Sequence, residues 1–439
     1  MNAGARLSGA GARAVLALEP LIRRAWPELG RALSARRAAA AELAAWGRRR
    51  EPGPLVWLHG ASAGELLGAA PAVRILRARE VGRPGRRATL LVTHSSPSGR
   101  PALEWLDPDR AGYPPLDHRR DCDSVLAAVR PGLLVFAKLD VWPGLAAAAA
   151  RAGTPTALIN GTVRPGSRRS GAVALRLFRE SYVRLATVGA ASPEDARRLA
   201  ALGVRSDRIE VTGDAAFDLA LERADRARAD GSAAAYRSAL GAPGARTPRL
   251  VAGSTWAADE AALLDAVATV RREGGPGWQL VIAPHEPTAA RVRELLASCA
   301  ARGVPAIRWS RLGESATAPA GAVIAFDEVG RLAELYAAGD AAYVGGGLGG
   351  TGLHNVLEPA AAGLPVLFGP HHDRTDALAL VRAGGGLSCS AGALAATLAG
   401  LADPAARARH GRAARAFVEA DTGAATRTAD LLSPLWPAG

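Results

Sequence analysis

The sequence predicts an α/β protein made of two doubly wound domains, each with a parallel sheet covered by helices on both faces. Three observations lead to this fold class. Short apolar runs alternate with Ala-rich stretches of helical composition along most of the chain. The runs are continuous rather than alternately polar, which is typical of parallel strands buried on both faces. The length of 439 residues exceeds one ordinary domain, and the alternating series is interrupted only once.

The first series of predicted strands occupies the N-terminal half. Each strand is a short apolar run followed by a segment of helical composition. The predicted strands are Leu55–Leu58, Ala88–Val92, Leu133–Phe136, Thr156–Ile159, Thr187–Gly189 and Ile209–Val211. Ser192 and Pro193 predict a helix start, because a hydroxyl caps the first turn and proline is tolerated there.

A change in composition separates the two series. Residues 221–248 are rich in Arg, Ala, Gly and Pro and are predicted to hold one helix and a linker. The second series of predicted strands is Leu250–Ala252, Gln279–Ile282, Ala306–Trp309, Ala322–Phe326, Ala341–Val344 and Pro365–Phe368. The predicted organisation is a basic helical region (1–50), a first domain (51–220), the linker (221–248) and a second domain (249–439). Ligands of such folds bind beyond the carboxyl ends of the strands, and the expected place is a cleft between the domains.

Composition excludes several classes of protein. Hydrophobic residues make up 49% and charged residues 22%, which excludes global disorder. The three cysteines (Cys122, Cys299 and Cys389) form no CxxC pair, which argues against a disulfide framework and a structural zinc site. Aromatic residues are 5% of the chain and are not interleaved with the basic ones, which argues against nucleic-acid binding.

The net charge of +13 has two readings. It favours anionic partners, such as phosphorylated substrates or an acidic lipid surface, or it reflects Arg on solvated faces. Residues 1–50 carry ten Arg against three Glu and contain no apolar run long enough to span a bilayer. This region is therefore either an ordinary surface helix or one that lies on an anionic membrane face.

The loop after the first predicted strand carries a candidate general base. It reads His59-Gly-Ala-Ser-Ala-Gly-Glu65, with small residues at a helix start that favours anions. Glu65 has the chemistry of a proton acceptor. Ser62 and Glu65 also have the spacing of a capping box, in which Glu65 would only tie back the helix start.

Two loops of the predicted second domain offer phosphate ligands. Gly253, Ser254 and Thr255 combine a glycine with two hydroxyls at a helix N-terminus, which suits a phosphate or simply a helix cap. Pro284 and His285 follow the next strand, where a lone histidine has either a structural or a binding role.

The segment from Gly345 to Pro359 is the strongest local signal. Six glycines in eight residues cost backbone entropy, which indicates a close approach to the backbone, for instance by a phosphate. His354, Asn355 and Glu358 follow at a helix start, where Asn355 and Glu358 also fit a cap pair. The run His371-His372-Asp373 lacks a coherent ligand set for a metal. The chain has no nucleophile elbow and no Walker A loop.

These loops resemble those of the 3-deoxy-D-manno-octulosonic acid (Kdo) transferases, which are inverting glycosyltransferases of the GT-B fold with two Rossmann-like domains facing across a cleft. The resemblance extends from about Trp57 to Asp430. The motifs that carry it are Trp57–Glu65, Val141–Pro143, Asn160–Thr162, Gly253–Trp256, Gly352–Ala360 and Phe368–Pro370. Each motif alone is weak, and their order and spacing together are specific.

The resemblance implies roles for individual residues. Glu65 matches the general base on the acceptor hydroxyl, and Asp140 matches an acidic position that assists the transition state. The segments that match the CMP-binding parts of the family contain Gly253, Ser254, Thr255, Pro284, His285, Val329, Gly330, Arg331, Asn355, Val356, Leu357 and Glu358. The implied donor is CMP-Kdo and the implied acceptor is a lipid A precursor. No metal, no other cofactor and no obligate protein partner are expected, and the implied location is the cytoplasmic face of the inner membrane, held peripherally.

The chain departs from the family pattern at several positions. His285 stands where many members have Arg, Asp140 is shorter than the usual Glu, and Ala216 stands where the family often has Lys or Arg, a proposed transition-state cation. A convincing N-terminal anchor helix is also missing. Two alternatives therefore stay open: another GT-B nucleotide-sugar enzyme, either a transferase or an epimerase, and a degenerate non-catalytic paralogue.

Overall fold

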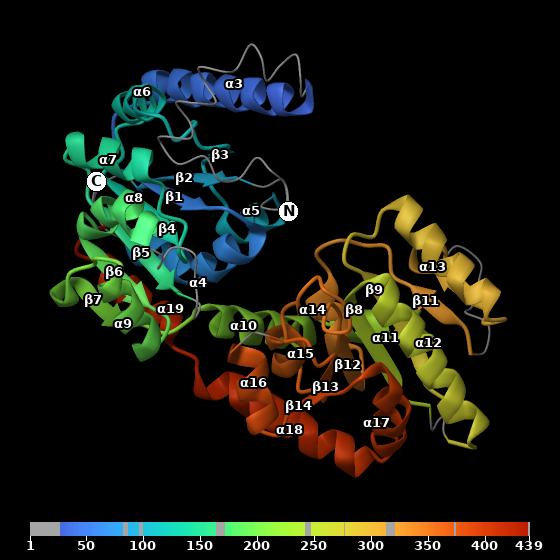
Figure 1. Cartoon of the computed structure of the whole chain (residues 1–439). Helices are drawn as coiled ribbons and strands as arrows, with labels where there is room; N and C mark the ends of the chain where they lie inside the picture. The colour runs from blue at the N-terminus through green and yellow to red at the C-terminus, as the bar shows by residue number, and fades with distance from the viewer. Residues whose placement is uncertain are drawn as a thin grey trace. The chain divides into compact units, whose positions relative to one another are not determined.

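The computed structural model describes residues 27–81, 87–95, 100–163, 172–241, 247–275, 277–312, 321–372 and 375–437. These residues form two compact units. The first contains the chain up to Leu219 and again from Thr422, and the second contains Ala220–Asp421. Each unit has a seven-stranded sheet, and the strands of the described residues pair in parallel (Figure 1). The predicted fold class of two doubly wound parallel-sheet domains is confirmed.

The first sheet has the order β3-β2-β1-β4-β5-β6-β7. Its strands are β1 (Leu55–Gly60), β2 (Thr89–His94), β3 (Arg110–Gly112), β4 (Leu133–Ala137), β5 (Thr156–Gly161), β6 (Thr187–Ala190) and β7 (Ile209–Val211). Successive side chains of a strand point to opposite faces. In β1, Leu55 and Trp57 join one apolar core while Val56 and Leu58 join another. A strand between two cores must be apolar throughout, which explains the continuous runs in the sequence.

Helices cover both faces of this sheet. One layer contains α3 (Pro27–Arg49), α6 (Arg119–Val129), α7 (Pro143–Arg151) and α8 (Ala172–Val183), and the other contains α4 (Ala63–Glu80), α5 (Arg100–Leu106) and α19 (Ala424–Leu432). Helix α9 (Pro193–Ala201) begins as predicted, with the Ser192 hydroxyl accepting the Asp195 N–H.

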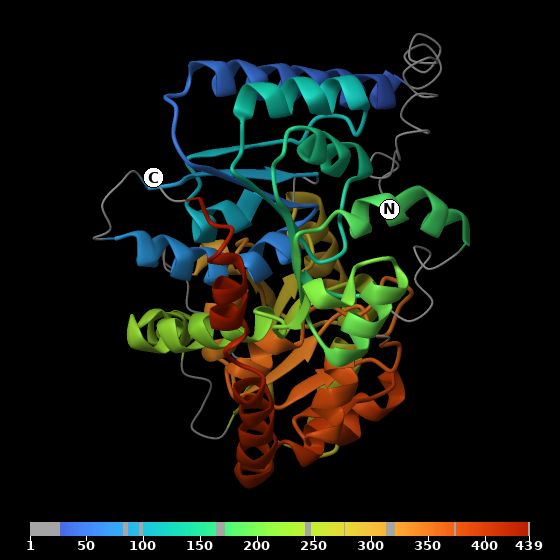
Figure 2. The ribbon, with the colours of Figure 1, turned by 90° about the vertical axis from the view of Figure 1, so that its left-hand side faces the viewer.

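The described part of the basic N-terminal region is helix α3, which lies alongside α6 (Figure 2). Its residues Ala40, Leu43 and Ala44 are buried in the core of the first unit. Residues 1–26 of the predicted region lie outside the described residues. Within the described ranges, no helix combines the length and apolar character that a membrane span requires.

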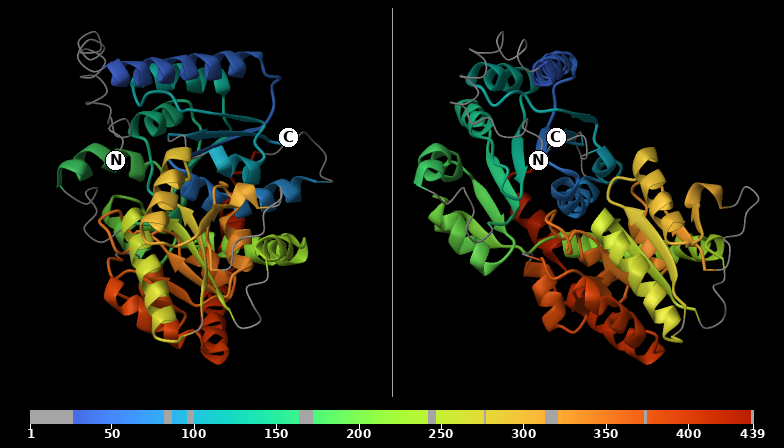
Figure 3. Two further views of the ribbon diagram at one scale, coloured as in Figure 1. Left: turned by 90° about the vertical axis from the view of Figure 1, so that its right-hand side faces the viewer. Right: turned by 45° about the vertical axis from the view of Figure 1, so that its right-hand side comes forward.

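The second sheet has the order β10-β11-β9-β8-β12-β13-β14. Its strands are β8 (Arg249–Thr255), β9 (Gln279–Pro284), β10 (Ala306–Arg308), β11 (Val323–Ala325), β12 (Ala341–Val344), β13 (Val366–Phe368) and β14 (Gly386–Ser388). Helices α12 (Ala257–Arg272), α13 (Ala289–Ala301) and α17 (Leu394–Gly400) pack together, as do α11 (Ser232–Ala239), α14 (Leu332–Ala337), α15 (Leu357–Ala361) and α18 (Pro404–Ala420). The unit also contains α16 (Thr375–Arg382). Figure 3 shows helices on both sides of this sheet.

Two strands were not predicted from the sequence. Both β3 and β14 have three residues and stand at a sheet edge. Edge strands are often short and less apolar than central ones, because they carry only one neighbour. Arg110–Gly112 is half-buried throughout, so it lacks the continuous apolar run that identified the other strands.

The domain boundaries differ from those predicted. The stretch 221–248, predicted as one helix and a linker, holds most of α10 (Ala216–Ala229) and all of α11, separated near Gly231 at φ 77°. Residues 249–439 were all assigned to the second domain, whereas the chain returns to the first unit at Thr422. The reason is apolar burial, because Ala429 and Leu432 of α19 pack into a core of the first unit.

Candidate active site

The strand order of each sheet points to one place for a ligand. In the first sheet the chain runs outward from β1 in one direction and from β4 in the other, and in the second sheet β8 and β12 hold the same positions. Loops leave such neighbouring strands in opposite directions, and ligands of open α/β sheets bind at this switch point. The loops selected from the sequence follow these four strands: 59–65 follows β1, 138–143 follows β4, 253–256 ends β8 and 345–358 follows β12.

Glu65 lies in the first turn of α4, at the switch point of the first sheet. Its Oε2 accepts the Ala61 N–H, while the Ser62 side chain makes no capping hydrogen bond. Neither hydrogen bond of the capping box that the sequence left open is formed, because the Ser62 hydroxyl does not cap the helix and Glu65 binds the N–H of Ala61 rather than that of Ser62. Burial raises the pKa of Glu65, and the neighbouring Asp140 carboxylate raises it further, against smaller opposing effects from the Ala61 N–H, Lys138 and His59. A carboxylate with a raised pKa is a better proton acceptor than an ordinary one.

Asp140 follows β4 and is held from two sides. Trp142 donates its Nε1–H to Asp140 Oδ2 at 2.9 Å, and His59 Nε2 lies 3.5 Å from the same oxygen. Two residues before it, Lys138 has a left-handed backbone with φ 58°, which is uncommon for a residue other than glycine and typical of functional loops. The first unit thus brings together Glu65 and Asp140, the two predicted catalytic residues.

A cation from α3 lies near Asp140. The Arg36 guanidinium lies over the Trp142 ring, 5.7 Å from its centroid. Burial lowers the pKa of Arg36, while Tyr113 and Asp140 raise it. An arginine remains charged under these conditions, so the first unit carries a positive group beside its paired acids. No sequence pattern pointed to Arg36, because it lies about a hundred residues before Asp140.

In the second unit, one buried carboxylate ties together the two loops at the switch point. Asp259 of α12 is fully buried. Its Oδ2 accepts the N–H groups of Trp256 and Gly346, both at 2.9 Å, and its Oδ1 accepts the Tyr343 hydroxyl at 2.8 Å. Burial and Asp259 raise the pKa of Tyr343, so its hydroxyl stays a donor. Asp259 therefore fixes the glycine-rich loop after β12 against the loop after β8.

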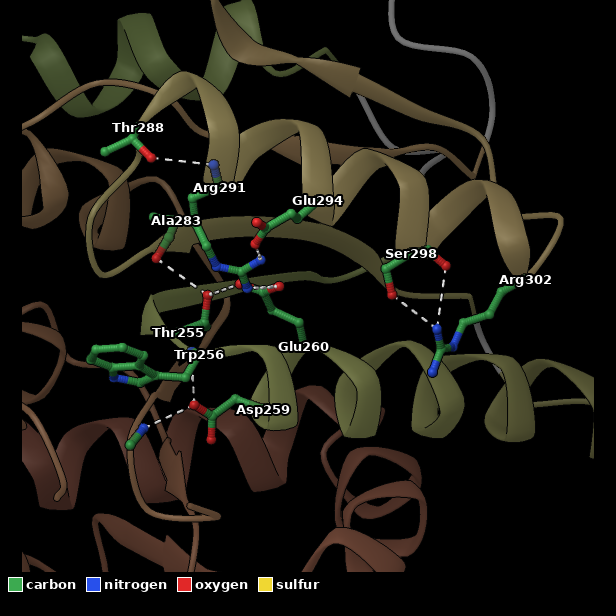
Figure 4. A network of polar contacts seen from close by, with 11 residues as sticks. Thr255, Trp256, Asp259, Glu260, Ala283, Thr288, Arg291, Glu294, Ser298 and Arg302 are labelled. Carbon is green, nitrogen blue, oxygen red and sulfur yellow. Dashed lines mark hydrogen bonds and ion pairs between the residues drawn. The ribbon is translucent and has the colours of Figure 1, made fainter. Parts of the chain in front are cut away.

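Thr255 is engaged in the same region. Its hydroxyl donates to Glu260 at 2.9 Å, and Arg291 of α13 pairs with Glu260 from the other side (Figure 4). The Thr255 side chain is therefore buried and hydrogen-bonded within the protein. Of the predicted phosphate ligands in this loop, Gly253 is buried and packs against Tyr336, and Ser254 is half-buried with φ 53°.

Three aromatic rings stack at the carboxyl ends of β8, β9 and β12. His285 stacks against both Trp256 and His354, with ring centroids 5.2 Å and 4.2 Å away, and the Trp256 and His354 centroids are 6.3 Å apart. Trp256 donates its Nε1–H to His354 Nε2 at 3.0 Å, and because an indole only donates, the His354 proton lies on Nδ1. Burial lowers the pKa of His285, so its ring is uncharged at neutral pH. Pro284, which precedes it, is buried at the end of β9.

The glycine-rich loop owes part of its composition to the protein itself. A Cβ on Gly345 would overlap the Ser254 carbonyl, and a Cβ on Gly346, at φ 95°, would overlap the Gly352 carbonyl. At Gly349, by contrast, a Cβ would meet nothing within 4 Å. The close approach inferred from the sequence is therefore backbone against backbone at the start of the loop, and its tip has room beside it.

The remaining predicted binding residues divide by exposure. Val329 is 69% exposed, and Arg331 is exposed and pairs with Glu334 at 3.5 Å. Asn355 is exposed and its side chain accepts the Leu357 N–H at 3.0 Å, which caps α15. Val356 and Leu357 are buried, so their side chains serve packing.

Arg223 of α10 joins two of the predicted donor segments. It donates to the Glu358 carboxylate and, at 3.2 Å, to the Gly330 carbonyl. Arg223 is 9% exposed, and its partners lie more than a hundred residues away along the chain. No sequence pattern identifies such a contact.

Replacing Arg291 by Ala is expected to destabilise the second unit by about 3–5 kcal/mol at pH 8, because it leaves the buried Glu260 carboxylate unpaired. Burial already raises the pKa of Glu260, and Arg291 opposes that effect. Without Arg291 the pKa rises further, so stability returns as the pH falls and Glu260 takes up a proton. Denaturant unfolding at pH 8 and pH 5 measures this, with Arg291→Ala/Glu260→Gln as the control that removes the unpaired charge. An equal loss for the single and double variants would contradict it.

Known proteins are similar to this chain in sequence. The family model of 3-deoxy-D-manno-octulosonic-acid transferase (kdotransferase) matches residues 38–219. The chain is 32% identical over 399 residues to the 3-deoxy-D-manno-octulosonic acid transferase of Bordetella pertussis, which covers 87% of this chain and 88% of the relative. It is 31% identical over 341 residues to the protein of that name from Chlamydia pneumoniae, covering 76% of this chain and 74% of the relative.

Solved structures are similar in fold. A glycosyltransferase from Rickettsia africae has a TM-score of 0.55 at 11% identity and covers 88% of this chain and 98% of its own. The UDP-GlcNAc 2-epimerase of Neisseria meningitidis, bound to UDP-GlcNAc, has a TM-score of 0.54 at 12% identity and covers 84% of this chain and 99% of its own. At these identities the likeness concerns the fold alone, which is that of the GT-B proteins.

Proposed function

The chain belongs to the 3-deoxy-D-manno-octulosonic acid transferase family, and from that premise we propose that it transfers Kdo from CMP-Kdo to a lipid A precursor, with inversion and with Glu65 as the general base. One observation carries the assignment of the base. Glu65 stands at the switch point of the first sheet with a pKa raised by burial and by Asp140. A carboxylate in that state accepts a hydroxyl proton near neutral pH more readily than an exposed one.

The proposed reaction is a single displacement at the anomeric carbon of Kdo. Glu65 takes the proton of the acceptor hydroxyl as the hydroxyl oxygen bonds to the anomeric carbon. At the same time the bond from that carbon to the CMP phosphate oxygen breaks. CMP leaves with the electron pair. Asp140, held by Trp142 and near His59, is placed to stabilise the positive charge that develops on the sugar ring.

The second unit is proposed to hold the CMP. Its switch point presents the N-terminus of α12, the open tip of the glycine-rich loop and the ring stack of Trp256, His285 and His354. Helix N-termini and backbone N–H groups favour an anion. We propose that these groups, with Arg331, take the charge of the leaving phosphate without a metal ion.

Charge also suits the acceptor. A lipid A precursor is an anionic glycolipid, and the chain carries a net charge of +13. Helix α3 ends in Arg48 and Arg49 and offers exposed positive charge. We propose peripheral attachment to the cytoplasmic face of the inner membrane, driven by basic residues against anionic headgroups.

The test is Kdo transfer by the purified protein. CMP-Kdo and a tetraacylated lipid A precursor are incubated with the enzyme in excess EDTA, and the products are identified by mass spectrometry. We expect one or more mass increments of Kdo, whose number gives the residues added, at the same rate with and without EDTA. Binding of CMP without any transfer would contradict the proposal, and thermal stabilisation by UDP rather than CMP would favour another nucleotide-sugar enzyme.

A further inference from the structure

A buried chain of polar side chains leads from β1 to Asp140. Trp57 and His59 of β1 and Thr93 of β2 all have 0% exposure. Trp57 donates its Nε1–H to Thr93 Oγ1 at 2.8 Å, and the same oxygen lies 2.9 Å from His59 Nδ1. The opposite ring nitrogen, His59 Nε2, is 3.5 Å from Asp140 Oδ2.

The chemistry of the groups gives this chain a direction. A carboxylate only accepts, so the ring nitrogen that faces Asp140 must carry a proton. In the neutral ring, Nδ1 then has a lone pair and needs a donor. The Thr93 hydroxyl is the group beside Nδ1, and because Trp57 already donates to its oxygen, its own proton is directed to His59. Donors running in one direction polarise one another in a buried, low-dielectric setting.

The His59 ring has little freedom to turn. It meets the Trp142 ring edge-on with centroids 5.2 Å apart, and the Phe136 ring likewise at 6.2 Å. Its Nε2 is buried and forms no hydrogen bond within the usual distance among the described residues. Asp140 is the acid it faces. A buried N–H without an acceptor costs free energy, and the Asp140 carboxylate is the acceptor that offsets this cost.

We propose that His59 is a positioning residue for Asp140. The Trp57–Thr93 pair holds His59 with its proton on Nε2, and that proton fixes Asp140 Oδ2 together with the Trp142 Nε1–H. The carboxylate then keeps one orientation beside Glu65 through the reaction. The catalytic consequence rests on the proposed Kdo transfer, whereas the tautomer of His59 does not.

The tautomer is measured first, on the wild-type protein. In a 15N-labelled sample at neutral pH, two-bond 15N–1H correlations distinguish a protonated from a bare ring nitrogen. We expect His59, assigned by its loss in His59→Gln, to show a bare Nδ1 and a protonated Nε2. The opposite tautomer would overturn the proposal. This readout holds even if the protein transfers no Kdo, so its failure and that of the proposed function are separate results.

Kinetics of paired variants test the positioning. His59→Gln keeps an N–H that can reach Asp140, whereas the shorter side chain of His59→Asn does not reach it. Thr93→Ser keeps the hydroxyl, and Thr93→Val removes it. We expect kcat to fall by at least about tenfold in His59→Asn and Thr93→Val with KM for CMP-Kdo little changed, since small displacements of reacting groups cost up to about 10²-fold. Gln and Ser should each recover part of that loss. Equal kcat values within each pair, in variants that melt like the wild type, would overturn the proposal.

Discussion

Replacing Glu65 by Gln is expected to reduce kcat for Kdo transfer by about 10²–10⁴-fold, the usual contribution of a positioned general base. The amide is nearly isosteric with the carboxylate, and its oxygen can still accept the Ala61 N–H that Glu65 binds. The first turn of α4 should therefore keep its shape while the proton acceptor is lost. Affinity for CMP, measured by calorimetry, should stay at the wild-type value.

The control for this variant is Glu104→Gln, which removes an exposed carboxylate from α5 of the same unit. It should transfer Kdo at the wild-type rate. If Glu65 only tied back the helix start, Glu65→Gln would lose thermal stability and keep its turnover per folded molecule. That outcome would assign Glu65 to the cap and would leave the reaction without its proposed base.

The pH profile provides a second reading of the same residue. Glu65 works as a base only when ionised, and its pKa is raised by burial and by the Asp140 charge. The rate should therefore fall on the acid side at a higher pH than for an ordinary carboxylate. In Asp140→Asn one of the two causes is removed, so the acid limb should move to lower pH on a reduced maximum rate. If the acid limb did not move, the Asp140 charge would not be a cause of the raised Glu65 pKa.

The sequence predicted the central strands and the loops that follow them, because both depend on local pattern. Strands between two helical layers carry continuous apolar runs, as β1 does over Leu55–Leu58, and loops at the carboxyl ends of such strands were recognisable by their small and polar residues. The edge strand β3 was missed because its residues are only half-buried. The return of α19 to the first unit depends on packing between residues far apart in the chain, which no local pattern reports.

The site shows the same division. Glu65 and Asp140 were selected as candidates through their motifs, and the structure brings them close to each other. The contacts that hold these candidate residues in place were not predicted, because they join residues far apart in the chain. Arg223 pairs with Glu358, 135 residues away, and Thr93 contacts His59, 34 residues away. The glycines illustrate a different limit: sequence shows that a close approach exists at Gly345, and only coordinates show that the approaching group is the backbone at Ser254.

Asp259 joins the loops after β8 and β12, which form the proposed donor side, and Asp259→Ala is expected to have the second largest effect. It would leave the N–H groups of Trp256 and Gly346 and the hydroxyl of Tyr343 without their acceptor. Each buried donor left unpaired costs about 1–3 kcal/mol. We expect the free energy of unfolding to fall by about 3 kcal/mol or more, and CMP affinity to fall at least about tenfold as the loop after β12 loses its tether.

Asp259→Asn distinguishes the hydrogen bonds that Asp259 makes from its negative charge, because Asn can keep the hydrogen bonds and lacks the charge. Both backbone N–H groups bind the same carboxylate oxygen, so one amide oxygen can accept both, and only the Tyr343 hydroxyl must turn to accept from the amide. We therefore expect Asn to retain most of the CMP affinity that Ala loses, and Tyr343→Phe to retain it as well. Calorimetric titration with CMP and thermal melting of the three variants give the comparison. If Asp259→Ala were destabilised and yet bound CMP as the wild type does, the nucleotide would have to bind away from the two loops that Asp259 joins. If Asn failed as badly as Ala, the negative charge itself, rather than the anchoring of Gly346 and Trp256, would be what the donor side requires.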